Sequence, residues 1–146
     1  MTQTSAVVDQ TWKAVPTPQW MLDLFKAIDV LDTSPETGYQ YYFAEDVDAT
    51  FGPQVIKGRD AIRKFLIDLD EPFVTKHLVT SIMQIDNCLT VLCSADLTKK
   101  GAPHESKMHV APLIDIFWLD DRGKIARWVV TFPKGLEKSA SAGVFN

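Results

Sequence analysis

The sequence predicts one α+β domain, in which helices near the N-terminus pack on an antiparallel β-sheet. Apolar residues recur at helical spacing in three segments before residue 71 and at every second position in four long segments after residue 76. Residues typical of tight turns separate the later segments. Because a sheet that packs on helices must curl around them, we expect an apolar pocket between the two layers.

Three N-terminal helices are expected. The first follows Pro16 and Pro18, and its apolar residues recur at helical spacing from Met21 to Leu31. The second is short and begins at Ser34-Pro35-Glu36, since proline is favoured at the first helical position, and it runs through Phe43. The third is RDAIRKFLIDLD, residues 59–70, in which one stripe is apolar. Residues 49–51 are expected to be extended, before a turn at Gly52-Pro53.

The predicted sheet consists of four long strands at residues 77–85, 89–97, 108–119 and 125–132. Their connections contain Asp86-Asn87, Lys100-Gly101 and Asp121-Arg122-Gly123, which favour tight turns between antiparallel neighbours. This domain is expected to span residues 16–133. Residues 1–15 are interpreted as a flexible N-terminal arm and residues 134–146 as a C-terminal tail.

Composition argues against several classes of partner. The net charge is −4, and the basic residues are scattered, so nucleic-acid binding is not expected. No secretion signal is evident and no apolar run approaches the roughly 20 residues that span a bilayer, so we expect a cytoplasmic protein without membrane contact. Cys88 and Cys93 match no metal or redox spacing and are interpreted as reduced thiols.

Asp115 interrupts the apolar stretch PLIDIFWLDD, residues 112–121. A buried carboxylate is costly unless it is paired, neutralised or directed at a cavity. Strand alternation places positions 109, 111, 113, 115, 117 and 119 on one face, and Ile116 and Trp118 on the other. If Asp115 faces the pocket, Leu113 and Phe117 line it on either side; the alternative is a structural carboxylate bonded to a neighbouring hydroxyl or at a backbone bulge.

Histidines are the other candidate acid–base groups. His77 begins the first long strand, and an imidazole exchanges protons near neutral pH. His109 is six residues from Asp115, about 20 Å along an extended strand, and is expected at the pocket rim or exposed at a strand end. No histidine spacing indicates a metal site and no phosphate-binding loop is present, so no cofactor is expected. Asp96 and Arg127 are interpreted as a cross-sheet ion pair.

Two stretches resemble a known family: YYFAEDVDATFGPQVIKGRDAIRKFL, residues 41–66, and PLIDIFWLDDRGKIARW, residues 112–128. Both resemble the SnoaL-like and ketosteroid-isomerase-like branch of the nuclear-transport-factor-2-like superfamily, and the resemblance covers residues 18–133. It implies a cone-shaped α+β barrel with three helices on a strongly curved sheet that encloses an apolar pocket. It also implies a homodimer through the outer face of the sheet, where Ile116 and Trp118 would lie.

The resemblance also implies site residues. The position of Asp115 is similar to that of the ketosteroid isomerase aspartic acid that an apolar site keeps protonated, so that it donates a hydrogen bond to an oxyanion. Phe51 occupies the position of that enzyme's general base, and Phe25 lies near that of its tyrosine, so ketosteroid isomerisation itself is not expected. His77 resembles the histidine in the corresponding strand of scytalone dehydratase. Asp115 and His77 are therefore the predicted catalytic pair.

The sequence thus predicts a cofactor-independent isomerase, cyclase or dehydratase that acts on a small apolar carbonyl compound of polyketide or terpenoid type, in a secondary-metabolite pathway. The predicted substrate contacts are Phe25, Tyr42, Phe51, Leu113, Phe117, His109 and Trp128. Two alternatives are a non-catalytic ligand-binding or dimeric scaffold protein, and an epoxide hydrolase. An open apolar pocket faced by both Asp115 and His77 would favour an enzyme, whereas a collapsed core there would favour a scaffold.

Overall fold

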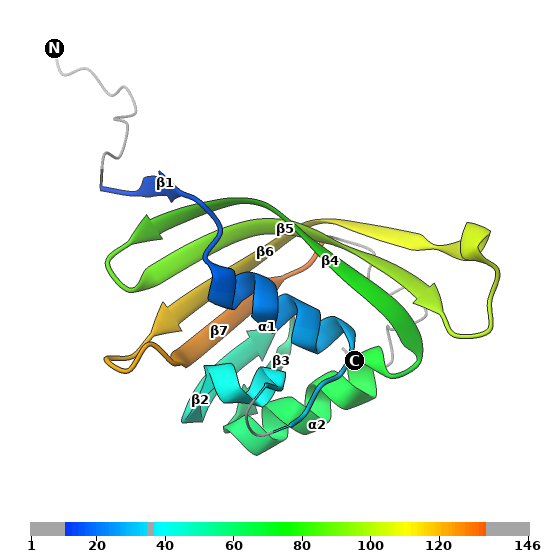
Figure 1. Cartoon of the computed structure of the whole chain (residues 1–146), viewed down its shortest axis with the longest axis horizontal. Helices are drawn as coiled ribbons and strands as arrows, with labels where there is room; N and C mark the ends of the chain where they lie inside the picture. The colour runs from blue at the N-terminus through cyan, green and yellow to red at the C-terminus, as the bar shows by residue number, and fades with distance from the viewer. Residues whose placement is uncertain (1–10, 35–36, 134–146) are drawn as a thin grey trace, which may run out of the picture.

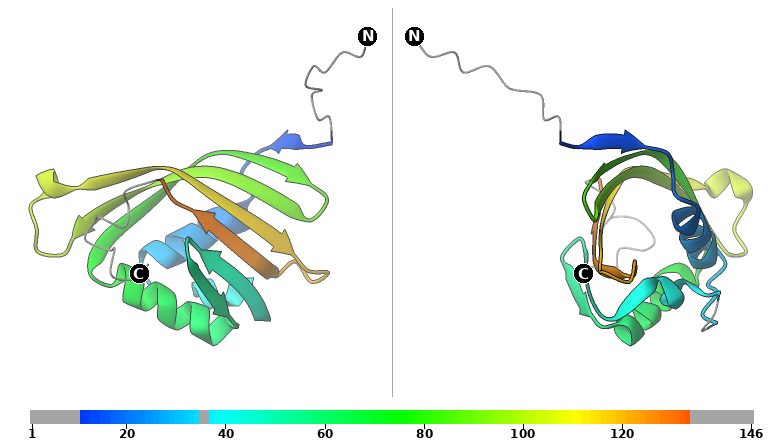
Figure 2. Two further views of the ribbon diagram at one scale, coloured as in Figure 1. Left: turned by 180° about the vertical axis from the view of Figure 1, so that it is seen from behind. Right: turned by 60° about the vertical axis from the view of Figure 1, so that its left-hand side comes forward.

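The computed structural model describes residues 11–34 and 37–133. Two α-helices, α1 (Gln19–Asp29) and α2 (Arg59–Asp70), lie on the concave side of one seven-stranded sheet (Figure 1). The strand order is β1-β4-β5-β6-β7-β2-β3, with bounds β1 Lys13–Val15, β2 Phe43–Phe51, β3 Gln54–Lys57, β4 Phe73–Ile85, β5 Cys88–Lys99, β6 Met108–Leu119 and β7 Ile125–Thr131. Figure 2 shows the sheet curling around the helices. The predicted α+β class is confirmed.

The four long strands predicted from the sequence form the centre of the sheet. β4, β5, β6 and β7 pair with their chain neighbours in antiparallel fashion, as expected. The sheet as a whole is mixed, however, because β2 runs parallel to β7, with Ala49 opposite Trp128. The expectation of a wholly antiparallel sheet was wrong, since the period of two that identifies a strand contains no information about its partner.

The third predicted helix is confirmed as α2, but the second is wrong. Residues Tyr39–Tyr42 form one turn of 3₁₀ helix, η1, and Phe43 already begins β2. Along β2, Phe43, Val47, Ala49 and Phe51 are buried, so the segment follows a strand pattern. Within the described residues, two α-helices therefore cover the sheet instead of the three expected. The expected helix start at residues 35–36 lies outside the described residues.

Part of the predicted N-terminal arm is a β-strand. Residues 13–15 form β1, which pairs with the edge of β4, so that Lys13 lies opposite Gln84. The rest of the predicted arm, residues 1–10, and the predicted tail, residues 134–146, lie outside the described residues. None of the helices in the described part of the chain is both long and apolar enough to cross a membrane.

The core lies between the concave face of the sheet and the apolar stripes of the two helices. Its fully buried large side chains include Met21, Leu24 and Ile28 from α1, Ile62 and Leu66 from α2, and Ile82, Leu89, Phe117 and Ile125 from the sheet. Burial of each such side chain contributes about 1.5–3 kcal/mol. Gly58 makes the turn from β3 into α2 at a φ of +93°, which strains any residue with a side chain.

A bulge in β6 changes which of its residues face the core. Cys93 pairs with Leu113, but Ala95, two residues further along β5, pairs with Val110, three residues back along β6. The extra residue in β6 reverses the alternation between the two halves of the strand. Leu113, Asp115 and Phe117 therefore face inward as predicted, whereas His109 turns outward and Val110 inward. The prediction that position 109 shares the face of Asp115 was wrong.

Candidate functional site

A cavity lies between the helices and the concave face of the sheet. The centres of water-sized molecules can occupy about 70 Å³ of it, whereas one water needs about 10–15 Å³ by the same measure. It is therefore large enough for a small organic molecule. Its lining residues are Ile28, Phe51, Leu66, Leu69, Asp70, Phe73, His77, Ala95, Leu97, Val110, Leu113, Asp115, Trp128, Val130 and Phe132. Twelve of these fifteen are apolar, and the other three are Asp70, His77 and Asp115.

Asp115 lies in the middle of β6 and is only 3% exposed. The indole Nε1 of Trp128 donates to its Oδ2 at 3.1 Å, and the Cys93 thiol donates to its Oδ1 at 3.8 Å. Burial raises the pKa of Asp115 to about 6, against the opposing effects of nearby His77 and of the two donors. The carboxyl group therefore exchanges its proton close to neutral pH.

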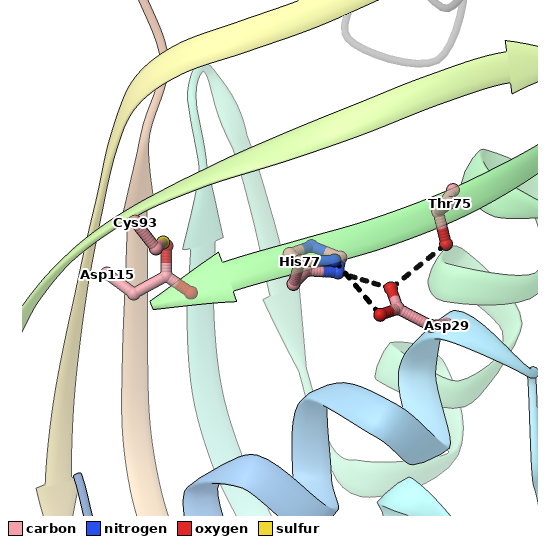
Figure 3. Close-up of polar contacts among 5 residues, drawn as sticks. All are labelled: Asp29, Thr75, His77, Cys93 and Asp115. Atoms are coloured by element: carbon pink, nitrogen blue, oxygen red, sulfur yellow. Dashed lines mark hydrogen bonds and ion pairs between the residues drawn. The ribbon is translucent and has the colours of Figure 1, made fainter. Parts of the chain in front are cut away.

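His77 is held by a carboxylate from helix α1. Its Nδ1 lies 2.5 Å from Asp29 Oδ1, and its backbone N–H donates to Asp29 Oδ2 at 2.9 Å. The Thr75 hydroxyl donates to the same carboxylate at 3.1 Å, and the Phe25 ring stacks on the imidazole with centroids 5.1 Å apart. In Figure 3, His77 lies between Asp29 on one side and Asp115 on the other. With Nδ1 bonded to Asp29, the orientation of the ring is fixed.

The charge on His77 is set by competing effects. Burial acts to lower the pKa of His77, but the hydrogen bond and charge of Asp29, together with the charges of Asp70 and Asp115, outweigh burial, and the pKa is raised. The raised pKa favours the imidazolium form of His77 relative to a free imidazole. Such a group donates hydrogen bonds and stabilises negative charge that develops on a ligand.

Asp70, the last residue of α2, is a third titratable group in the cavity that sequence reasoning did not identify. It is 7% exposed, and burial raises its pKa to about 6, with a downward effect from His77 and an upward one from Asp29. Within residues 11–34 and 37–133, no hydrogen-bond donor contacts its carboxyl oxygens. Asp70 is therefore a largely buried residue whose carboxyl oxygens accept no hydrogen bond from the described chain and are not fully shielded from solvent.

The sequence contains a signal for both missed carboxylates. Asp29 follows Met21 and Phe25 at steps of four, and Asp70 follows Ile62 and Leu66 in the same way, so each extends the buried stripe of its helix. An acidic residue at the end of an apolar helical stripe points toward the core, where a carboxylate requires a partner or a function.

The predicted substrate contacts fall into three groups. Phe51, Leu113 and Trp128 line the cavity. Three others lie outside the lining: Phe25 packs behind His77, Phe117 stacks on Trp128, and Tyr42 is half-buried in η1 against Tyr41. His109 is exposed and its Nδ1 bonds Asp96 Oδ1 at 2.6 Å on the outer face of the sheet, so it does not reach the cavity rim.

The predicted ion pair between Asp96 and Arg127 does not form. Asp96 pairs instead with His109 and, at 3.7 Å, with the Lys107 ammonium, while the Arg127 guanidinium lies over the Trp118 ring at 5.1 Å. Asp96 and Arg127 lie on strands separated by β6, and each finds a partner on that strand. The histidine and lysine were not recognised as partners because the β6 bulge was not predicted.

The site brings proton donors and acceptors together in apolar surroundings. Two carboxyl groups with a pKa of about 6 and one histidine face the same small cavity, so protons can be taken up and released there near neutral pH. Among the described residues, no three His, Cys, Asp or Glu side chains are grouped so that they could hold a metal ion.

The comparisons with known proteins concern the fold. No protein-family model and no curated protein matches the chain. Among solved structures, a hypothetical protein of Catenulispora acidiphila with a ketosteroid isomerase-like fold, in complex with trimethylamine, is 17% identical, with a TM-score of 0.67, over 82% of this chain and 88% of its own. A protein of Jannaschia sp. CCS1, named as a SnoaL-like polyketide cyclase, is 17% identical with a TM-score of 0.62, over 76% and 81%.

A third neighbour is an epoxide hydrolase of M. tuberculosis, 15% identical with a TM-score of 0.60, over 77% of this chain and 75% of its own. All three resemble this chain over most of its length. Because their sequence identity is low, the likeness supports a shared fold alone. The chain has the NTF2-like fold of the ketosteroid isomerase-like and SnoaL-like proteins, and the resemblance seen in the sequence is confirmed at the level of the fold.

Proposed function

We propose that this protein is a cofactor-independent enzyme that isomerises, cyclises or dehydrates a small apolar carbonyl compound by acid–base catalysis. The observation that carries the proposal is that Asp115 and His77 face one apolar cavity. Asp115 takes a proton from the carbon next to the carbonyl group, and the His77 imidazolium stabilises the resulting enolate oxygen. The apolar lining keeps bulk water away from the enolate.

The open cavity favours an enzyme over a scaffold. A scaffold would gain stability from a filled core at this place, and it would have no use for two buried carboxyl groups whose ionised forms burial disfavours. A passive carrier of small ligands would have the cavity but would not require exchangeable protons within it. The neighbours that are named as polyketide cyclases support a substrate of polyketide type, and a terpenoid ketone has the same combination of apolar body and carbonyl group.

Proton exchange tests the proposal without knowledge of the natural substrate. The protein is incubated in D₂O with 2-tetralone and with acetophenone, and loss of the α-proton signal is followed by NMR. We expect exchange above the buffer rate, and Asp115→Asn to slow it by about 10²–10⁴-fold, the usual contribution of a general base. The control is Asp96→Asn, which alters a carboxylate on the outer face. Exchange in neither ketone, or equal exchange in Asp115→Asn, would contradict the proposal.

Opening of an epoxide is a second candidate, which the presence of Asp70 favours. That reaction needs one group to protonate the epoxide oxygen and another to take a proton from the attacking water. Asp70 and Asp115 are two separate carboxyl groups on the same cavity, and one structural neighbour is an epoxide hydrolase. Hydrolysis of styrene oxide that depends on both carboxyl groups, without α-proton exchange in ketones, would select this reaction instead.

A further inference from the structure

The cavity has many hydrogen-bond acceptors and few donors. Its two carboxyl groups present four oxygens, and the two donors from the described chain that contact them, the Trp128 indole and the Cys93 thiol, both contact Asp115. His77 donates through Nδ1 to Asp29, which leaves only its other nitrogen for a ligand. In the described chain, Asp70 therefore has acceptor capacity that a donor on a ligand would satisfy.

Among the described residues, negative charge in and beside the cavity exceeds positive charge. When all groups are ionised, Asp29, Asp70 and Asp115 face the single imidazolium of His77, so that two negative charges have no cationic partner. Among the described residues, no lysine or arginine belongs to the cavity lining. A neutral ligand leaves this imbalance in place, whereas a positively charged ligand removes part of it.

The walls of the cavity suit an organic cation. Phe51, Phe73, Trp128 and Phe132 contribute aromatic rings to the lining, and the faces of such rings attract ammonium groups. An alkylated ammonium combines a positive charge with an apolar surface, which matches a lining of carboxyl groups among aromatic and aliphatic side chains. An inorganic cation would leave the apolar walls without contacts.

We propose that the cavity binds a small organic cation, in which an alkylammonium group of the substrate pairs with Asp70. This inference rests on the proposed function for the identity of the substrate site, and it adds that the substrate bears a basic nitrogen. Asp70 on α2 holds the ammonium group of the substrate. Asp115 and His77, on two strands of the sheet, remain available for proton transfer at another part of the substrate.

Protonation of Asp70 makes binding depend on pH. The titratable groups that face Asp70 are His77 on β4, Asp29 on α1, Tyr39 on η1 and, across the cavity, Asp115. Burial raises the pKa of Tyr39 to about 12, so this phenol is neutral at pH 5 and at pH 8. Asp70, with a pKa of about 6, is mostly protonated at pH 5 and ionised at pH 8. An alkylammonium, like the lysine ammonium with a pKa of about 10, is charged at both pH values.

Calorimetric titration of the full chain tests the inference with two probes of similar shape, trimethylammonium chloride and neutral tert-butanol. We expect trimethylammonium to bind at pH 8, to bind roughly tenfold more weakly at pH 5 because Asp70 is then protonated, and to outcompete tert-butanol. Asp70→Asn should weaken binding at pH 8 by about tenfold or more. The matched control is Asp68→Asn, two residues earlier in α2, which alters an exposed carboxylate paired with Lys64 and should change affinity less than about twofold.

Three outcomes with the unaltered protein would overturn the inference: no binding of trimethylammonium at pH 8, equal affinity for tert-butanol, or equal affinity at pH 5 and pH 8. The comparison of the two pH values uses the unaltered protein and shows whether a carboxylate of the cavity holds the cation. Because Asp115 titrates in the same range, the comparison is repeated in Asp115→Asn: a pH effect that persists there assigns the cation to Asp70 even if Asp70→Asn does not fold, and one that disappears there would overturn the inference. Failure here leaves ketone exchange through Asp115 intact, whereas loss of ketone exchange with normal trimethylammonium binding would contradict the proposed function alone.

Discussion

At the scale of single residues, the site depends on how each carboxyl group is solvated. Asp115 and Asp70 are both buried, but Asp115 accepts bonds from Trp128 and Cys93, whereas Asp70 accepts none from the described chain. Donors to a carboxylate favour its ionised form, so the two groups respond differently to a ligand that brings a donor or a positive charge. In our proposals, this difference suits Asp115 to the role of base and Asp70 to that of counter-ion.

Trp128→Phe tests the role of the indole donor. Phenylalanine keeps the aromatic wall but removes the N–H that donates to Asp115 Oδ2. Because that hydrogen bond stabilises the carboxylate, we expect the pKa of Asp115 to rise from about 6 by roughly one further unit, in line with about 1.5 kcal/mol for a hydrogen bond to a charged group. Carboxyl-selective NMR, with Asp115→Asn for assignment, measures the shift. An unchanged or lower pKa of Asp115 in Trp128→Phe would show that the indole does not stabilise the ionised form of Asp115.

At the scale of elements, the end of α1 is joined to the middle of β4 by Asp29. One carboxylate accepts from the Thr75 hydroxyl and from the His77 backbone, and it bonds the His77 ring. These contacts connect segments nearly fifty residues apart in the chain, and they determine where the imidazole points. His77 was predicted to begin its strand, but β4 starts at Phe73, and the His77 ring contacts α1 through Asp29.

Asp29→Asn should lower the pKa of His77. The substitution keeps an acceptor for the backbone and the hydroxyl but removes the charge, so that burial, which lowers the pKa, is opposed only by Asp70 and Asp115. Proton NMR of the imidazole Cε1–H measures the effect. The control is Asp23→Asn, an exposed carboxylate on the same helix that bonds Gln19. A His77 pKa that falls equally in both variants would contradict a specific role for Asp29.

At the scale of the whole molecule, the buried site makes stability depend on pH. Asp70 and Asp115 have folded-state pKa values of about 6, above the unfolded value of 3.8, so the folded state holds these protons more tightly and loses stability as pH rises from about 4 to above 6. The raised pKa of His77 acts in the same direction, because its contribution is lost as pH rises through the folded value. Asp32 and Asp96, whose pKa values are lowered, act in the opposite direction, but only toward more acidic pH.

We therefore expect the protein to unfold more easily at pH 8 than at pH 5. The two carboxyl groups together account for a difference in the free energy of unfolding on the order of a few kcal/mol. Urea denaturation at the two pH values measures it. Asp70→Asn combined with Asp115→Asn should remove most of the difference by raising stability at pH 8, whereas Asp68→Asn should leave it unchanged. Greater stability of the unaltered protein at pH 8 would contradict this account.

The prediction of a homodimer rests on exposed apolar residues on the outer face of the sheet. Leu92 and Ile114 pair across β5 and β6 and are 39% and 37% exposed, and Ile116 and Trp118 continue the same face of β6. Such an apolar face favours association with a second copy. We expect light scattering to give the mass of a dimer, and Leu92→Glu with Ile114→Glu to give that of a monomer. Val30→Glu, at an exposed position after α1, is the control. A monomeric unaltered protein would contradict the prediction.

The sequence alone determined the long strands, the first and last helices and the inward orientation of Asp115, because local periodicity specifies a helix or a strand and the face on which each residue lies. Tertiary structure decided what periodicity does not contain: the parallel pairing of β2 with β7, the bulge that turns His109 outward, and the meeting of Asp29 and Asp70 with His77. These are contacts between segments far apart in the chain. They form because packing of both helices in the curved sheet brings the ends of two apolar stripes to one cavity, where the cost of burying charge raises the pKa of Asp70 and Asp115.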